Sequence, residues 1–174
     1  MARTVHLVSR FFGSLRPGGP NPSDREWAES QLLPDELELW RRLSGPDRRH
    51  SAAVARRVER SLGDRATRPV LAAALLHDVG KQDAHLRTYG RVVATLAGGV
   101  VGHDQAVIHQ WTLTTGFTRR VGLYLIHPQL GGDLLAVAGS EPLTVAWTRE
   151  HHLPSEDWTI DPELATALHD ADDD

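Results

Sequence analysis

Apolar residues recur every three or four positions along most of the chain, which is the spacing of amphipathic helices. The clearest stripe consists of four residues at intervals of four: His50, Val54, Val58 and Leu62. We expect Asp47 to cap this helix at its start and Gly63 to end it. No segment alternates between apolar and polar residues with period two, so the pattern predicts an all-α fold.

Capping residues, prolines and glycines divide the chain into about six to eight helices. They predict helices that start near Ser23 and at Pro34, and others over 67–79, much of 86–122, 118–126, 129–138, 141–150 and the segment after Asp161. Residues 70–76 are apolar almost all round, so we expect them in the core, with Gly80 closing that helix as residue C′. Residues 1–22 have little periodicity and contain Gly-Gly-Pro-Asn-Pro. They predict an N-terminal arm, followed by a single helical domain over 23–174.

The composition limits the chemistry that the protein can carry. Among 174 residues there are ten histidines and no cysteine, so a metal would be bound by His, carboxylate or water. A net charge of −4 argues against a protein dedicated to a nucleic-acid duplex or to an anionic membrane. No apolar stretch approaches the roughly 18 residues of a membrane span, and we expect no secretory signal at the N-terminus. We therefore expect a cytoplasmic protein.

Basic and acidic residues are unevenly distributed. Nine arginines lie between Arg41 and Arg68, whereas nine acidic residues and no Arg or Lys occur from Glu150 onward. Two solvated helix faces would explain this distribution, and a basic rim that attracts a phosphate-bearing ligand is the alternative. Eighteen of the nineteen basic residues are Arg, and the single lysine is Lys81.

Lys81 follows an adjacent histidine and carboxylate, His77 and Asp78, at the end of the predicted core helix. Buried charged groups need partners or a metal. Imidazole with carboxylate suits Fe, Mn, Co, Ni or Zn, and one carboxylate can bridge two ions. His50, on an apolar stripe, is either a hydrogen-bonded core histidine or a ligand that faces inward.

Helical geometry indicates which acidic residue of the last helix can complete such a site. Asp172 follows Leu164 and Leu168 at intervals of four and shares their face, whereas Asp170 points about 200° away from Leu168. Asp172 is therefore the candidate ligand. The alternative is that it is a solvated acid in the Asp-rich tail.

The order of these residues resembles a known family. His50, the run His77-Asp78-Val79-Gly80-Lys81 and the late Asp172 are similar to the H…HD…D motif of the HD superfamily of metal-dependent phosphohydrolases. Ile-His-Pro-Gln-Leu-Gly at 126–131 and Glu-His-His at 150–152 resemble the HPxxG element and the paired histidines of its HD-GYP branch. The resemblance covers about residues 47–173. In place of that branch's Glu and DGxGYP loop the chain has Leu-Pro-Ser-Glu-Asp-Trp at 153–158, so it is HD-GYP-like without the GYP loop.

The resemblance implies an HD-domain helical bundle that binds one or two divalent metal ions. One ion would be held by His50, His77, Asp78 and Asp172. A second would be held by His127, His151 and His152, with Asp78 as the bridge. Fe or Mn is favoured, with Zn, Co, Ni and Mg as alternatives. A helix-terminal role for His127 and a surface location for the His151–His152 pair are the alternatives to metal binding.

We expect the other aromatic candidates to have structural or solvated positions. These are His6, His85, His103, His109, His169 and the five tryptophans, of which Trp158 could instead stack on a base.

The implied function is hydrolysis of a phosphate mono- or diester, a nucleotide or cyclic nucleotide, by attack of a metal-bridging hydroxide. Asp78 and Lys81 are the candidate catalytic residues, and Lys81 would supply a positive charge to the phosphate. The same ligands would serve a diiron oxygenase of HD type, which is the first alternative. The second is a non-catalytic HD domain that binds a nucleotide. The sequence predicts no oligomeric state.

Overall fold

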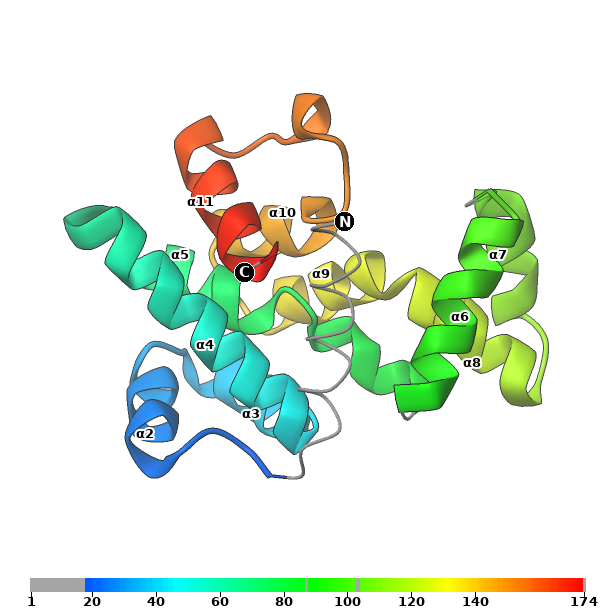
Figure 1. The fold of residues 1–174 in the computed structure, drawn as a ribbon, viewed down its shortest axis with the longest axis horizontal. Helices are drawn as coiled ribbons and strands as arrows, with labels where there is room; N and C mark the ends of the chain where they lie inside the picture. The colour runs from blue at the N-terminus through cyan, green and yellow to red at the C-terminus, as the bar shows by residue number, and fades with distance from the viewer. Residues whose placement is uncertain (1–17, 87, 103, 174) are drawn as a thin grey trace, which may run out of the picture.

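A computed structural model describes residues 18–86, 88–102 and 104–173 (Figure 1). These residues form helices and loops and contain no strand, which confirms the predicted all-α class. Ten α-helices and three 3₁₀ helices are described: α2 (Pro22–Ser30), α3 (Pro34–Arg42), α4 (Gly45–Leu62), η1 (Gly63–Arg65), α5 (Arg68–Leu76), η2 (Val79–Ala84), α6 (Thr88–Val100), α7 (Gln105–Thr112), α8 (Gly116–Leu125), α9 (His127–Val137), α10 (Pro142–Glu150), η3 (Ser155–Asp157) and α11 (Pro162–Asp173).

The number of α-helices in the described residues is slightly higher than the predicted six to eight. One reason lies in the segment 86–122, where Gly102 and Gly116 both adopt positive φ, at 60° and 64°. Such a conformation ends a right-handed helix, and glycine adopts it without steric cost. The segment therefore divides into α6, α7 and the start of α8.

Three predicted helix boundaries differ from the structure. Ser44, and not Asp47, caps α4, because the Ser44 hydroxyl accepts a hydrogen bond from the Asp47 backbone N–H at 3.3 Å. Helix α9 begins at His127 instead of residue 129, since Pro128 in its first turn has no N–H to leave unsatisfied. Gly80 does not close α5, which ends at Leu76, but lies inside η2.

Helix α5 is the centre of the main hydrophobic core. All seven of its residues from Val70 to Leu76 are buried, as their apolar run predicts. Helices α4 and α10 pack against α5, and α4 contributes Val54 and Val58 from the predicted stripe. The chain therefore leaves this core directly at His77 and Asp78.

Helices α6, α7 and α8 form a separate group at one side of the molecule (Figure 1). A small cluster of buried residues lies beneath them: Ala84, Leu86, Ala94 and Val121. Arg91 of α6 ties this group to α4, because its guanidinium donates to both carboxylate oxygens of Asp47, at 2.6 and 2.8 Å. The α6–α8 group thus has its own small core, and the bidentate ion pair of Arg91 joins it to α4.

A close contact between η2 and α9 explains why residue 80 is glycine. A Cβ atom at Gly80 would overlap the carbonyl oxygen of His127 and lie 2.7 Å from the backbone nitrogen of Gly131. Both obstacles are backbone atoms, which cannot rotate away. The absence of a side chain at Gly80 therefore lets η2 approach the start of α9 and brings His127 close to Asp78.

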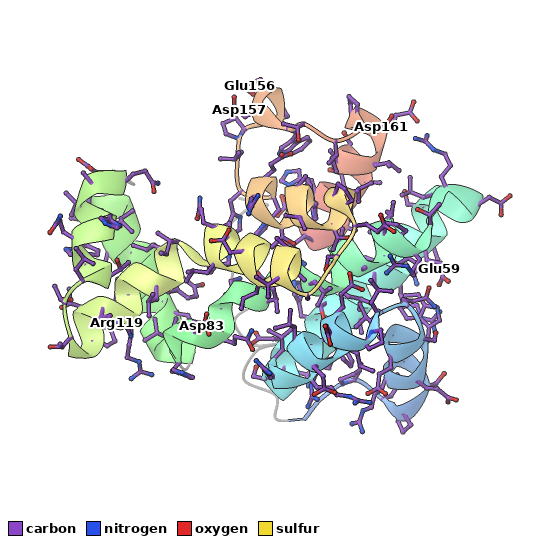
Figure 2. All side chains as sticks on the ribbon, turned by 180° about the vertical axis from the view of Figure 1, so that it is seen from behind. Glu59, Asp83, Arg119, Glu156, Asp157 and Asp161 are labelled. Carbon is purple, nitrogen blue, oxygen red and sulfur yellow. The ribbon has the colours of Figure 1, made fainter. Side chains whose placement is uncertain are left out.

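Several arginines of the basic segment form ion pairs within the protein. Four of the arginines between 41 and 68 pair with acidic residues of neighbouring segments: Arg41 with Glu29, Arg56 with Asp24, Arg65 with Asp161 and Arg68 with Glu36. Figure 2 shows the acidic residues Glu156, Asp157 and Asp161 at the outer edge made by η3 and the start of α11. No helix in the described part of the chain is both long and apolar enough to cross a bilayer. The predicted arm at 1–22 lies largely outside the described residues, as do His6 and His103.

Candidate metal centre

Three histidines of the candidate site each lie at or just after the C-terminal end of a helix. His77 is the C-cap of α5, His151 is the C-cap of α10, and His127 follows the C-cap of α8. The last carbonyl groups of a helix lack partners within the helix. Each ring therefore has a backbone carbonyl group of the preceding helical turn within reach.

Each of the three rings forms a hydrogen bond to such a carbonyl group. Nδ1 of each ring lies 2.7–2.9 Å from a carbonyl oxygen three residues earlier: Ala74 for His77, Tyr124 for His127 and Thr148 for His151. A carbonyl oxygen only accepts, so Nδ1 carries the proton and donates it. In a neutral ring Nε2 then presents a lone pair, as a metal ligand does.

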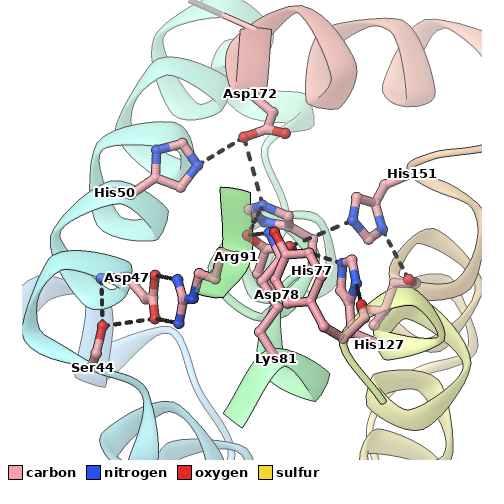
Figure 3. A network of polar contacts seen from close by, with 12 residues as sticks. Ser44, Asp47, His50, His77, Asp78, Lys81, Arg91, His127, His151 and Asp172 are labelled. Carbon is pink, nitrogen blue, oxygen red and sulfur yellow. Dashed lines mark hydrogen bonds and ion pairs between the residues drawn. The ribbon is translucent and has the colours of Figure 1, made fainter. Parts of the chain in front are cut away.

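The Nε2 atoms of all three rings are buried and make no hydrogen bond within the described residues. Oδ1 of Asp78 is also buried and makes no hydrogen bond within the described residues. Four buried polar atoms without partners would be costly if nothing bound them. The four lie around Asp78 (Figure 3), in two groups of ligand atoms that could each hold a cation.

Asp78 lies between two groups of ligands. Its Oδ1 lies 3.3 Å from Nε2 of His127 and 3.6 Å from Nε2 of His151, and its Oδ2 lies 3.5 Å from Nε2 of His77. Two ligands about 2.1 Å from one metal are roughly 3.0–3.4 Å apart at octahedral or tetrahedral angles. The observed separations are therefore close to those of a coordination shell, with one carboxylate oxygen facing each group.

His50 and Asp172 complete the first group. Nε2 of His50 lies 2.8 Å from Oδ1 of Asp172, and the same oxygen lies 3.6 Å from Nε2 of His77. The ligand atoms of His50, His77 and Asp78 are all within 4.8 Å of one another. Asp172, the residue that helical geometry predicts on α11, thus lies beside His50 and His77.

His152 completes the second group. One ligand atom from each of Asp78, His127, His151 and His152 lies within 4.8 Å of the others. The ring centroid of His152 is 4.0 Å from that of His151 and 5.2 Å from that of His127. His152 is exposed, whereas His127 and His151 are buried. The second group is therefore the one that opens to solvent.

Lys81 occupies a different position from the ligands. Its ammonium donates a hydrogen bond of 2.5 Å to Oδ2 of Asp78, and 13% of its side-chain surface is exposed. Burial by itself lowers the pKa of Lys81, but the Asp78 carboxylate outweighs burial and raises it. Lys81 therefore keeps its positive charge beside the carboxylate that joins the two groups.

The pKa values of Asp78, His127 and His77 are shifted in different directions. Burial raises the pKa of Asp78, but the charges of Lys81 and His77 outweigh this effect and hold the pKa well below its usual range. Burial lowers the pKa of His127 to about 4, which keeps the ring neutral. Burial also lowers the pKa of His77, but Asp78 and Asp172 outweigh it and raise that pKa to about 9. In the absence of metal His77 is thus the ring that carries a proton.

The residues present fit a divalent metal ion. Two groups of imidazole and carboxylate ligands share Asp78: His50, His77 and Asp78 in one, with Asp172 adjoining, and Asp78, His127, His151 and His152 in the other. A ligand set of nitrogen and oxygen without sulfur suits Fe, Mn, Co, Ni or Zn. The structure thus supports the predicted metal ligands and determines neither the metal nor the number of ions.

The remaining candidates lie away from the centre. His85 and His109 are exposed, and His169 lies beside Trp158, with ring centroids 5.4 Å apart. Trp158 also packs on Trp147, and its indole N–H donates to the Leu153 carbonyl at 3.2 Å. Packing therefore accounts for Trp158.

Two features of the site had no part in the sequence prediction. The first is the set of carbonyl groups that orient the three rings, which a histidine directly at a predicted helix end could have indicated. The second is the pair of Asp47 and Arg91, which lies beside the centre in Figure 3. It joins segments 44 residues apart, and no local pattern indicates such a pairing.

Comparisons with models of known protein families, with curated proteins and with solved structures found no match to this chain. The resemblance to the HD superfamily consequently depends on the motif residues and on their arrangement alone.

Proposed function

We propose that this protein is a metal-dependent phosphohydrolase of HD type that acts on a small phosphate mono- or diester, a nucleotide or cyclic nucleotide. One observation carries the proposal: the Nε2 atoms of His77, His127 and His151 and Oδ1 of Asp78 converge, buried and without hydrogen-bond partners. Networks that serve only stability satisfy their buried polar atoms. This network instead leaves the four atoms available to cations in the two ligand groups that share Asp78.

The metal, when bound, supplies Lewis-acid activation of water and positive charge for the phosphoryl oxygens. The chain's own residues have separate roles. The backbone carbonyls fix the ring orientations, and Asp78 holds the two ligand groups together. Lys81 provides a buried ammonium that can pair with an anionic substrate, because its charge is retained within hydrogen-bond distance of the centre. His152, on the exposed side, lies where a substrate can enter.

Metal analysis followed by an activity screen tests the proposal. The protein is purified without chelator, its metal content is measured, and phosphate release from mono- and diesters of nucleotides is followed under anaerobic conditions with the metal found. We expect turnover of at least one ester, abolished by chelator and by Asp78→Asn. Metal-loaded protein that hydrolyses none of these esters would contradict the proposal.

A second candidate is supported by the same histidine-rich ligand set, which also suits a pair of iron ions. A diiron oxygenase would show a near-ultraviolet iron chromophore and would consume oxygen with its substrate. Nucleotide binding without metal and without turnover would instead indicate a binding domain. The metal analysis and the anaerobic assay therefore separate all three functions.

A further inference from the structure

Tyr124, near the end of α8, is a half-buried aromatic residue next to the candidate metal centre. Its backbone carbonyl orients the ring of His127. Its own ring lies beside that ring, with centroids 5.6 Å apart and planes tilted by 34°. The ammonium of Lys81 lies 5.9 Å from the centre of the Tyr124 ring. Tyr124 therefore adjoins both a ligand of the second group and the lysine that pairs with Asp78.

The phenol oxygen of Tyr124 lies within electrostatic range of two cationic side chains. Burial by itself lowers the pKa of Lys81 and that of Arg91, but neighbouring groups outweigh burial and raise both values. Asp78 and Tyr124 are among these neighbours in each case. Charge interactions weaken with distance, so the phenol oxygen, the ammonium and the guanidinium belong to one neighbourhood beside Asp78.

Arg91 is held firmly in this neighbourhood and retains unused donors. Its guanidinium donates to the carbonyl of Leu86 at 3.1 Å and to both carboxylate oxygens of Asp47. These bonds use three of the five N–H groups of a guanidinium. A quarter of the Arg91 side chain is exposed, at 25%, and Figure 3 shows it beside the centre together with Lys81.

Three side chains with hydrogen-bond donors thus come from three different elements, Lys81 from η2, Arg91 from α6 and Tyr124 from α8. The hydroxyl of Tyr124 has no hydrogen-bond partner among the described residues. We propose, on the basis of the proposed function, that this hydroxyl binds substrate by donating a hydrogen bond to a phosphoryl oxygen beside the ammonium of Lys81. Phosphoryl oxygens are charged acceptors, which form the stronger hydrogen bonds. The guanidinium of Arg91 adds a permanent positive charge nearby.

Binding of inorganic phosphate to the metal-loaded protein tests the proposal without depending on turnover. Tyr124→Phe keeps the ring and the backbone carbonyl that orients His127, and it removes only the hydroxyl. Metal content and the free energy of unfolding are expected to equal those of the wild type. The Kd for phosphate, measured by isothermal titration calorimetry, is expected to rise about tenfold or more, as for the loss of one hydrogen bond to a charged group.

Thr114→Val is the matched control. It removes an exposed hydroxyl of the same α6–α8 group, which donates to the carbonyl of Trp111 at 2.7 Å, and it is expected to leave the Kd unchanged. Equal phosphate affinity in Tyr124→Phe and the wild type would overturn the proposal, as would a metal-loaded wild type that binds no phosphate. Loss of metal in Tyr124→Phe would also overturn it, because Tyr124 would then act through His127.

The same variant separates this proposal from the proposed function. Hydrolysis of a nucleotide ester with equal kcat/KM in the wild type and Tyr124→Phe would contradict only the role of Tyr124. Phosphate binding that depends on Tyr124, without hydrolysis of any ester, would support the phosphoryl contact and contradict only the hydrolase.

A double-mutant cycle shows whether Tyr124 and Lys81 bind the same phosphoryl group. The rise in the phosphate Kd caused by Tyr124→Phe is expected to differ at least twofold between the wild-type and Lys81→Ala backgrounds, because groups that share a partner are coupled. Thr114→Val and Lys81→Ala should have independent effects. Independent effects of Tyr124→Phe and Lys81→Ala would overturn the shared contact.

Discussion

Nε2 of His50 lies 2.8 Å from Oδ1 of Asp172, although the two residues are 122 positions apart in the chain. Helices α4 and α11 make this contact, and a second one beside it joins Arg57 to the carbonyl of Ala171 at 2.8 Å. Leu168, one turn before Asp172, is buried in the main core. Helix α11 therefore presents the Asp172 carboxylate to the site on the same face that packs against the main core.

Asp78→Ala is expected to abolish metal binding and activity. The substitution removes the carboxylate that both ligand groups share and leaves the buried ammonium of Lys81 without its partner. In the presence of chelator we expect the free energy of unfolding to fall by about 3 kcal/mol, as for other broken buried ion pairs. Elemental analysis and urea denaturation measure the two effects.

The double variant Asp78→Ala/Lys81→Met provides the control for that loss of stability. Without the ammonium nothing charged is left unpaired, so most of the lost stability is expected to return while the metal stays absent. Metal content equal to that of the wild type in Asp78→Ala would refute the assignment of Asp78 as a ligand.

Lys81→Ala is expected to lower the activity and to leave the metal content unchanged. An ammonium cannot ligate a metal, so metal content should be kept while phosphate release falls by about a hundredfold or more, the size of a lost electrostatic contact to the transition state. Lys81→Arg should restore part of the activity only, because a planar guanidinium differs from a compact ammonium. Loss of metal in Lys81→Ala would show that Lys81 organises the site instead.

Gly80→Ala is expected to weaken both the fold and the second ligand group. The new methyl group would meet the backbone of His127 and Gly131, so α9 must move and carry His127 away from Asp78. Gly99→Ala is the matched control, because a Cβ there meets nothing within 4 Å, and it should stabilise α6 by about 0.5–1 kcal/mol. Thermal unfolding and metal content decide the comparison, and a Gly80→Ala protein with wild-type stability and metal content would contradict the role given to this contact.

The helices were predictable from the sequence, whereas their convergence was not. Local signals predicted α11 from Asp161-Pro162 and predicted Asp172 from its position relative to Leu168. The prediction that Gly80 ends a helix was wrong. Glycine is needed there because of a close contact with α9, which lies about 50 residues later in the chain. Contacts of this kind depend on tertiary packing, which a local sequence pattern does not indicate. His127 and His151 were found through the resemblance, and only the structure revealed that each is oriented by a carbonyl group at the end of the preceding helix.

Asp47→Asn is expected to loosen the attachment of α6 to α4. Burial raises the pKa of Asp47, but the hydrogen bonds and charge of Arg91 outweigh it and lower that pKa. The folded-state pKa is thus below the unfolded value, so the pair stabilises the fold fully above the unfolded pKa of about 3.9 and is lost as pH falls through the folded pKa. At pH 7 the variant should lose about 2 kcal/mol, because Arg91 keeps some access to solvent.

Acid titration of stability checks this assignment. The wild type should lose more stability than Asp47→Asn between pH 5 and pH 3 (roughly, from the reference pKa), since the variant has no carboxylate to protonate. Arg91→Met keeps the carboxylate but removes its partner, so burial would raise the pKa of Asp47 and this variant should lose less stability than the wild type as the pH falls through this window. Parallel curves for wild type and variants would show that the pair contributes nothing to folding.

His127→Ala separates a centre of two ions from a centre of one. Asp78 directs one oxygen to His77 and the other to His127 and His151, so loss of His127 affects only the second group. If that group binds an ion, metal content at saturation should drop from about two per chain to about one, because His50, His77, Asp78 and Asp172 remain. Activity should fall further than occupancy, since a nucleophilic water between two ions depends on both for its lowered pKa. His109→Ala, on the exposed side of α7, is the control and should change neither quantity. A wild-type content near one at saturation, or equal contents in wild type and His127→Ala, would show that only one ion is bound and that His127 acts on substrate or packing instead.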